Sequence, residues 1–285
     1  MNNAAQWQCR DRILDLAAPV VMGVLNVTPD SFSDGGRHVA PGSALAHARR
    51  MIGEGAAIID VGGESTRPGS RPASVDEELG RVIPVIEALR RESGIFISVD
   101  TSKPEVMSAA VAAGADIVND VRALGEAGAI EAAAASGAGV CLMHMLGEPR
   151  TMQDAPHYEN VVEEVGSFLA ARMRACRDAG IDAARMVIDP GFGFGKRTVD
   201  NLALLKQLAG FEALGVPIAV GLSRKSMLAK LTGRGVDERL AGSVALATIA
   251  VLHGARIVRA HDVSATVDAV RVAAAVIKGE AIDGT

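Results

Sequence analysis

Aromatic residues and cysteines are scarce in this chain of 285 residues. Aromatics make up 3% of it, whereas Ala, Val, Ile and Leu abound, and this composition favours helices packed on inner strands over a β-sandwich. The three cysteines, Cys9, Cys141 and Cys176, are odd in number and far apart, so they indicate neither a disulfide scaffold nor a metal site. Such cysteine usage is typical of a reducing compartment, and we expect a cytoplasmic protein.

The chain also lacks long apolar runs and an excess of positive charge. Its apolar runs are shorter than a membrane span, and charged residues stand near the N-terminus where a signal peptide needs its apolar core. The formal net charge is −5, so no global positive field attracts nucleic acid or an anionic membrane. We therefore expect small-molecule substrates and neither a nucleic-acid nor a membrane partner.

Eight short segments rich in β-branched residues recur along the chain. Each ends in polar or Gly-rich residues and precedes a segment with helical periodicity. We expect strands at 20–28, 56–64, 95–101, 115–121, 139–145, 186–191, 217–225 and 255–262, and helices at 75–92, 104–113, 161–179 and 240–252, among others. Eight such units predict one (β/α)8 barrel domain over residues 1–285, with its core at about 18–280 and a short N-terminal extension. A doubly wound open sheet is the alternative, because it shares this alternation.

Polar residues stand at the ends of all eight predicted strands, where barrel enzymes place their chemistry. They are Asn26, Asp60 with Glu64, Asp100, Asn119 with Asp120, His144, Asp189, Lys225, and Arg259 with His261. Helix capping and turn formation explain some of them. A barrel that needs only stability could end its strands in Gly, Ala and Ser, so the pattern predicts a ligand pocket.

Positive charge concentrates at this predicted rim although the protein is acidic. The residues are Arg67 after the second strand, Arg224 and Lys225 at the seventh, and Arg259 and His261 at the eighth. This reversal indicates an anionic ligand, and the loops after strands seven and eight commonly hold phosphate in this fold. Asn26 offers a neutral oxygen suited to Mg²⁺, which keeps most of its water and binds mainly through substrate phosphates. For Arg224, a surface ion pair is an equal alternative.

A second group of residues suits a flat heterocycle. Asp100, Asn119 and Asp189 offer acceptors and an amide for a ring edge with adjacent N–H donors. Met143 and Phe194 are candidates to lie against the faces of the ring, although a Met at a strand end is more often core.

Lys225 and the segment "DPGFGFGK" at 189–196 each have more than one possible function. Lys225 could meet a ring carbonyl, and a Schiff base with a carbonyl substrate is the alternative. The segment is no Walker A loop, because Pro190 stands where that motif needs Gly and Arg197 where it needs Ser or Thr. His144 has no second His or Cys at a metal-ligand spacing and is a weak catalytic candidate.

Seven segments, taken in order, resemble the dihydropteroate synthases of the pterin-binding enzyme family. They are "MGVLNVTPDSFSDGG", "IIDVGGESTRPG", "SVDTSKPEV", "IVNDV", "DPGFGFGK", "GLSRKS" and "RAHDV". The resemblance implies a (β/α)8 barrel and a Mg²⁺-dependent transferase. The enzyme would join 6-hydroxymethyl-7,8-dihydropterin diphosphate to p-aminobenzoate in folate synthesis. It would be a homodimer and a target of sulfonamide drugs.

The same motifs assign roles to residues. The pterin pocket would comprise Asp100, Asn119, Met143, Asp189, Phe194, Gly221 and Lys225. The diphosphate subsite would comprise Asn26, which also binds the metal, with Thr66, Arg67, Arg259 and His261; the p-aminobenzoate subsite would comprise Thr66, Arg67, Pro68 and Ser226. The catalytic residues would be Phe32 and Asp34, which cover and stabilise a pterin methylene cation, with Lys225, Arg259 and His261.

Two alternatives for function and one for assembly remain at this point. A pterin-dependent methyltransferase would share the barrel but would have no diphosphate to expel. A non-catalytic pterin-binding paralogue would be expected to have damaged loops. The helix at 240–252 is apolar nearly all round, so its second face is expected to meet another subunit, unless it is a small-residue helix wedged between neighbours.

Overall fold

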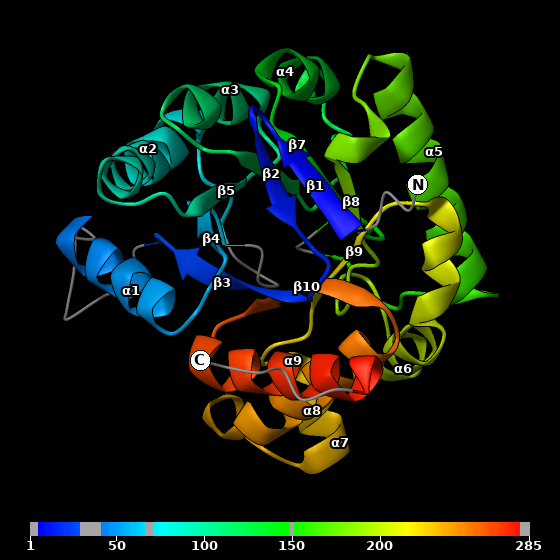
Figure 1. Ribbon diagram of the computed structural model, residues 1–285. Coiled ribbons are helices and arrows are strands. Elements are labelled where there is room, and N and C mark those ends of the chain that lie inside the picture. The colour runs from blue at the N-terminus through cyan, green and yellow to red at the C-terminus, as the bar shows by residue number, and fades with distance from the viewer. Residues whose placement is uncertain (1–4, 29–40, 66–70, 149–150, 280–285) are drawn as a thin grey trace.

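The computed structural model describes residues 5–28, 41–65, 71–148 and 151–279, and a closed barrel of parallel strands forms its centre (Figure 1). The strands are β3 (Val20–Asn26), β4 (Ile58–Gly62), β5 (Phe96–Asp100), β6 (Ile117–Asp120), β7 (Gly139–Met143), β8 (Met186–Asp189), β9 (Ile218–Gly221) and β10 (Ala255–Ala260). The last strand, β10, pairs with both β9 and β3 and so closes the sheet. The predicted barrel is confirmed and the open sheet is excluded.

A layer of helices surrounds the barrel. The α-helices are α1 (Pro41–Gly53), α2 (Val75–Glu92), α3 (Pro104–Ala112), α4 (Ala129–Ser136), α5 (Val161–Asp178), α6 (Thr198–Lys206), α7 (Ser226–Thr232), α8 (Leu240–Leu252) and α9 (Val263–Lys278). Short 3₁₀ turns lie at Ala183–Arg185, Leu208–Leu214 and Val236–Glu238. Within the described residues, no helix combines the length and apolar character needed to cross a membrane.

Local sequence signals set several of these boundaries. Helix α2 begins with a capping box, in which Ser74 Oγ accepts from the Glu77 N–H at 3.2 Å and Glu77 Oε2 accepts from the Ser74 N–H at 2.8 Å. Helix α3 has Pro104 in its first turn, where a missing N–H costs no helical hydrogen bond. Helices α2 and α8 have the predicted bounds.

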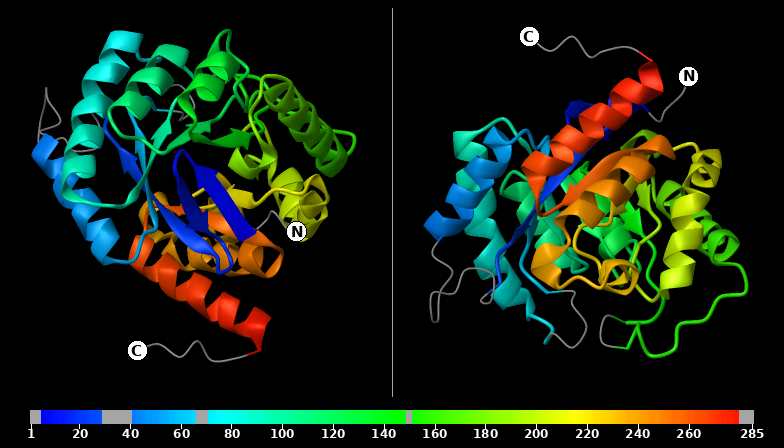
Figure 2. Two further views of the ribbon diagram at one scale, coloured as in Figure 1. Left: turned by 45° about the horizontal axis from the view of Figure 1, so that its top comes forward. Right: turned by 90° about the horizontal axis from the view of Figure 1, so that it is seen from below.

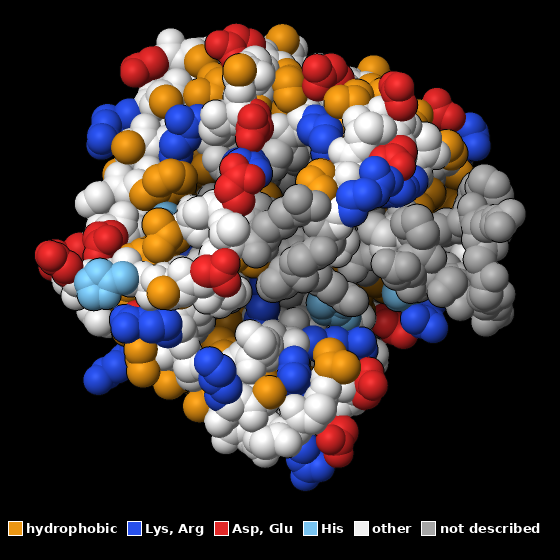
Figure 3. Space-filling model, turned by 180° about the vertical axis from the view of Figure 1, so that it is seen from behind, with side chains coloured by type: hydrophobic (Ala, Val, Ile, Leu, Met, Phe, Trp, Pro, Cys, Tyr) orange, Lys and Arg blue, Asp and Glu red, His pale blue; other side chains and the backbone are white. Residues whose placement is uncertain are grey.

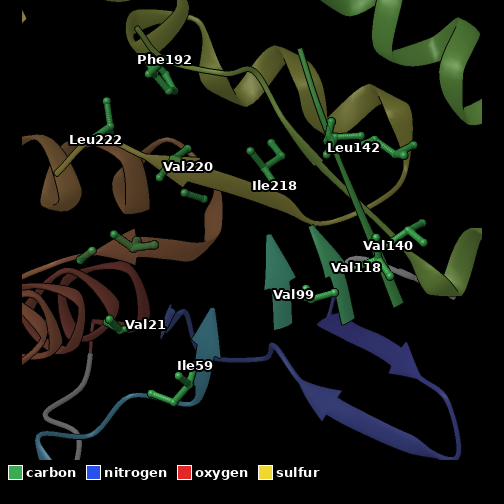
Figure 4. Packing of buried hydrophobic residues seen from close by; sticks show 14 of the residues in the cluster. Val21, Ile59, Val99, Val118, Val140, Leu142, Phe192, Ile218, Val220 and Leu222 are labelled. Atoms are coloured by element: carbon green, nitrogen blue, oxygen red, sulfur yellow. The ribbon is translucent and has the colours of Figure 1, made fainter. Parts of the chain in front are cut away.

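The outer faces of the strands pack against the helices. Val21, Ile59, Val99, Val118 and Val140 are buried members of one large apolar cluster that joins the sheet to the helical layer (Figure 4). Their neighbours in sequence point to the interior of the barrel, because side chains alternate along a strand. The strands are thus buried on both sides, as their nearly continuous apolar sequences predict.

The N-terminal extension is a β-hairpin that covers the amino end of the barrel (Figures 1 and 2). Strands β1 (Gln6–Cys9) and β2 (Arg12–Asp15) pair with each other and carry Trp7 and Cys9 into a cluster with inward-facing barrel residues such as Ile117 and Val187. Trp7 is fully buried, and its Nε1–H donates to Arg185 O at 2.8 Å. The sequence predicted an extension, but its function as a plug comes from the structure.

The Trp7 side chain should contribute strongly to stability. Trp7→Ala is expected to lower the free energy of unfolding by about 3–5 kcal/mol, since it empties a large fully buried site. Urea unfolding followed by circular dichroism measures this. Ile13→Ala is the control, because Ile13 is 61% exposed on the same hairpin and should change stability by less than about 0.5 kcal/mol. Equal effects of the two changes would contradict the plugging role.

Candidate active site

Inward-facing residues from all eight barrel strands meet at the end opposite the hairpin. Residues two or four positions apart on a strand share a face. On each strand, a residue of the barrel interior therefore shares its face with a residue nearer the carboxyl end. These are Met22 and Asn26, Ile58 and Asp60, Phe96 and Asp100, Ile117 and Asn119, Cys141 and Met143, Val187 and Asp189, Ala219 and Gly221, and Ile257 and Arg259. The fold therefore brings together one residue from each strand, seven of which the sequence had singled out as site residues.

Arg259 links several members of this ring. Its Nε donates to Asp60 Oδ2 at 2.6 Å, and its Nη2 donates to Asp100 Oδ2 at 2.7 Å. The Asn119 Nδ2 also donates to Asp60 Oδ2, at 3.2 Å. Burial raises the pKa of Asp100 to about 7, although the charge of Arg259 opposes the shift.

Asp60 is a member of the site whose role does not follow from the sequence. The sequence predicts only its place at a strand end. Asp60 is fully buried, and its Oδ1 accepts no hydrogen bond from any residue in the described part of the chain. Its position two residues after the interior Ile58 could have revealed that it faces the pocket.

Lys225, Phe194 and Asp189 form a second part of the site. Lys225 Nζ lies 4.2 Å from the centroid of the Phe194 ring. Burial lowers the pKa of Lys225 to about 8, aided by the charge of Arg259. Asp189 Oδ1 accepts from the Gly191 N–H at 2.7 Å, whereas its Oδ2 has no such partner among the described residues. Asp189 Oδ2 and Lys225 Nζ are thus an acceptor and a donor available to a ligand.

The rim carries less free positive charge than the sequence indicates. Arg224 pairs with Asp262 through Nε at 3.0 Å and Nη2 at 2.5 Å, so the ion-pair alternative is what the structure shows. His261 Nδ1 lies 3.0 Å from Ser223 Oγ, and burial lowers the pKa of His261 to about 4. His261 is therefore neutral near pH 7, and it contributes a hydrogen-bonding group to the rim but no charge.

Several predicted site residues lie outside the described part of the chain. These are Phe32, Asp34, Thr66, Arg67 and Pro68. Ser226 is described, and it begins α7 as an exposed residue directly after Lys225.

The side-chain oxygen of Asn26 suits a hydrated Mg²⁺ ion. A Cβ built on Gly62 would lie 3.6 Å from Asn26 Oδ1, so this oxygen lies beside the carboxyl end of β4, whereas Asp100 Oδ2 already accepts from Arg259 Nη2 at 2.7 Å. No group of three or more acidic, His or Cys side chains suited to a metal occurs within the described ranges. A sparse oxygen donor set of this kind suits Mg²⁺, which keeps several waters and binds largely through phosphate.

His144 is a buried partner of a lysine. Its Nδ1 lies 2.9 Å from Lys196 Nζ, and its ring meets Phe168 edge to face at a centroid distance of 4.9 Å. Burial and the charge of Lys196 lower the pKa of His144 from 6.5 to about 3. These contacts give His144 a role in packing and in holding Lys196.

Acid should destabilise the fold in a manner that depends on His144. Below pH 6.5 the unfolded chain binds a proton at this residue that the folded chain does not, so each step of acidification favours unfolding. From pH 7 to pH 5, His144 should account for about 2 kcal/mol of lost stability. Urea titrations across this range should give a shallower pH dependence for His144→Asn than for the wild type. Parallel curves would contradict the shifted pKa.

A cavity of about 420 Å³ lies beside this site and shares Asp100 with it. The loops after β4, β5 and β6 line it, and its cations are already paired. Lys103 contacts Glu64 and also lies 2.5 Å from Glu78 Oε2, while Arg122 lies 3.1 Å from Glu126 Oε1. The cavity thus enlarges the mouth beside Asp100, and its described ion pairs join the loops that surround it.

The face opposite the hairpin presents Lys, Arg and His side chains close to one another, near its middle (Figure 3). This mouth holds acceptors for a ring edge, a half-buried arginine and a neighbouring lysine, all at the carboxyl ends of the strands. These features define a (β/α)8 barrel enzyme whose ligand combines a polar heterocycle with an anionic group.

The comparisons with known proteins agree with this class. The chain belongs to the pterin-binding enzyme family, whose model, described as "Pterin binding enzyme", matches residues 22–261. It is 54% identical over 267 residues to the dihydropteroate synthase of Escherichia coli K12, covering 94% of this chain and 95% of that protein.

Solved structures of dihydropteroate synthases share the fold. That of Yersinia pestis with a sulfonamide drug superposes with a TM-score of 0.92 at 47% identity and covers 96% of this chain and 99% of that one. That of Xanthomonas albilineans in complex with 7,8-dihydropteroate has a TM-score of 0.87 at 51% identity and covers 95% and 98%.

Proposed function

We propose that this chain catalyses the dihydropteroate synthase reaction. It condenses 6-hydroxymethyl-7,8-dihydropterin diphosphate with p-aminobenzoate and yields 7,8-dihydropteroate and diphosphate. The observation that carries the proposal is the ring of Asp100, Asn119, Asp189 and Arg259 at the mouth of a barrel 51% identical to a synthase that binds 7,8-dihydropteroate.

The pterin would bind by its edge to the acceptors of the ring. Among the described residues, Asp189 uses only Oδ1 as an acceptor, from the Gly191 N–H. Its Oδ2 can therefore accept from adjacent N–H donors of the pterin. Lys225 Nζ, which faces the Phe194 ring, would donate to the pterin carbonyl. Met143 contributes an inward apolar surface beside Asp189, its partner in register on β8.

The diphosphate would lie toward Arg259, His261 and Asn26. Arg259 is held by two carboxylates and therefore presents its guanidinium in a fixed orientation. Bound Mg²⁺, held by Asn26 and diphosphate oxygens, would offset the negative charge of the leaving group. Arg67, predicted for the same subsite, lies outside the described residues.

The chemistry proposed for these residues is dissociative. Diphosphate leaves first, and the pterin methylene cation that remains is stabilised by resonance and by nearby carboxylates. The arylamine of p-aminobenzoate is neutral at pH 7, so its nitrogen attacks without a strong general base. This agrees with the contacts of the two histidines, since the buried His144 lies against Lys196 and the half-buried His261 lies against Ser223.

A direct assay tests this function. The purified protein is incubated with the pterin diphosphate, p-aminobenzoate and Mg²⁺, and diphosphate and dihydropteroate are measured. We expect both products in equal amounts, their loss with EDTA and their recovery with added Mg²⁺. Pterin binding without any diphosphate release would favour the non-catalytic paralogue, and methyl transfer from a methylated pterin would favour the methyltransferase.

We further propose that the enzyme is a homodimer through α8 and α9. These helices lie side by side (Figure 1) and expose Ile249, Leu252, Val272 and Val276, with Val276 67% exposed. Exposed apolar side chains on two neighbouring helices are typical of an association surface.

A charge on this surface should separate the subunits. Light scattering after size exclusion should give twice the mass of one chain for the wild type and the mass of one chain for Val276→Asp, because dimerisation would bury the new carboxylate. Val199→Asp is the matched control, since Val199 is 62% exposed on α6, away from these helices. A monomeric wild type would overturn the proposal.

We propose a cytoplasmic location, because the cysteines of this chain are free thiols. Cys9, Cys141 and Cys176 are all free and buried, which fits a protein that folds in a reducing compartment. Fractionation of the native host with an antibody to this chain would test the location.

A further inference from the structure

Lys196 is a buried lysine at the end of the segment "DPGFGFGK", and the binding roles described above do not include it. It is 3% exposed. Its Nζ lies 2.9 Å from His144 Nδ1, 2.9 Å from Gly191 O and 3.1 Å from Phe194 O. A fourth, longer contact joins it to His144 O at 3.4 Å.

The three short contacts match the donors of an ammonium group. A protonated lysine has three N–H donors and no acceptor, so each partner must accept. The lowered pKa of His144 makes its ring neutral, and in the tautomer that carries its proton on Nε2 the Nδ1 atom accepts from Lys196. Burial lowers the pKa of Lys196 to about 7, and the charge of Asp189 together with these acceptors favours the ammonium form.

The backbone around Lys196 turns tightly and brings two carbonyl groups to the lysine. Gly191, Gly193 and Gly195 all have positive φ, at 71°, 80° and 64°, so the chain turns repeatedly and directs the carbonyls of Gly191 and Phe194 to one point. A Cβ on Gly191 would overlap His144 O. The segment thus lies directly on the chain that follows β7.

This segment forms one wall of the proposed pterin pocket. It begins at Asp189, and it carries the Phe194 ring that faces Lys225 Nζ at 4.2 Å. A Cβ on Gly193 would lie 3.2 Å from Lys225 Cδ, so the backbone of the segment also packs against the lysine stem. A shift of this wall would move Phe194 and Lys225 relative to Asp189.

We propose that Lys196 is a positioning residue for pterin binding. Its ammonium, oriented by His144, ties the carbonyls of Gly191 and Phe194 together and thereby fixes Phe194 against Lys225. The inference rests on the proposed function, and it adds a buried Lys and His pair to the residues on which substrate affinity depends.

Other hydrogen bonds also hold the segment 189–196, so the loss of Lys196 should have a local effect. Gly193 N–H donates to Asn201 Oδ1 at 2.7 Å, Gln153 Nε2 donates to Gly193 O at 2.6 Å, and Tyr158 Oη donates to Gly195 O at 2.8 Å. Loss of Lys196 should therefore displace the turn around Phe194 without releasing the whole segment.

The first test compares Lys196→Met with Lys206→Met, a matched removal of an exposed lysine from the adjoining helix α6. Lys196→Met should raise the KM for the pterin diphosphate at least tenfold and leave the KM for p-aminobenzoate within twofold. Lys206→Met should change neither. A Lys196→Met enzyme with an unchanged pterin KM, or with both KM values raised equally, would overturn the proposal.

A second pair of variants covers the case in which Lys196→Met does not fold. Asn places an acceptor close to the position of the histidine Nδ1, whereas Leu has none. His144→Asn should therefore retain a pterin KM within threefold of the wild type, and His144→Leu should raise it about tenfold, with circular dichroism showing that both are folded. Equal pterin KM values for the two would contradict the role of the pair. An inactive wild type would instead refute the proposed function, so the two failures are distinguishable.

Discussion

Arg259→Met is expected to lower the free energy of unfolding by about 3–5 kcal/mol and to abolish turnover. Arg259 is the shared partner of Asp60 and Asp100 at 2.6 and 2.7 Å. Asp60 is fully buried, and without the guanidinium its charge would keep only the amide of Asn119 as a partner among the described residues. A buried carboxylate that loses its cation is among the most destabilising changes that a single substitution can make.

Urea unfolding, followed by the fluorescence of the buried Trp7, measures this effect. Arg256→Met is the matched control, because Arg256 lies on the same strand and, among the described residues, its one hydrogen bond is a long 3.4 Å contact to Ala17 O. It should cost less than about 1 kcal/mol. The double variant Asp60→Asn with Arg259→Met should recover part of the lost stability, since an amide at position 60 carries no charge. If Arg259→Met is as stable as Arg256→Met, the Arg259 ion pairs do not stabilise the fold.

Asp189→Asn is expected to weaken pterin binding by about 2–3 kcal/mol, which is roughly thirty- to more than a hundredfold in Kd. The side-chain oxygen that accepts from the Gly191 N–H at 2.7 Å can remain in place. The amide nitrogen then replaces Oδ2 and turns two donors toward the N–H groups of the pterin. Calorimetric titration with the pterin diphosphate measures the loss.

The stability of Asp189→Asn should stay close to that of the wild type. Burial raises the pKa of Asp189, so the charged form gains little from the fold itself and an amide can take its place. Asp182→Asn is the control, because Asp182 caps the turn before the same strand and Asn can cap it equally well. Unchanged pterin affinity in Asp189→Asn would remove Asp189 from its assigned role.

Local pattern in the sequence predicted the architecture correctly, because each βα unit carries its own signals. Strands buried on both faces have short continuous apolar sequences, and the Ser74 and Glu77 capping box marks the start of helix α2. Eight such units could close only into a barrel or open into a sheet, and the pairing of β10 with β3 decided between them. The positions of the site residues at strand ends followed from the same pattern.

What the sequence alone determined is therefore the series of strands and helices and the chemical types at the strand ends. The tertiary structure decided which of those groups remain available to a ligand, since partners such as Asp262 for Arg224 or Lys196 for His144 lie 38 and 52 residues away in sequence. It also decided that the N-terminal hairpin plugs the barrel with Trp7. Alternation along one strand is a local property, whereas the neutralisation of a charge depends on what the closed barrel brings beside it.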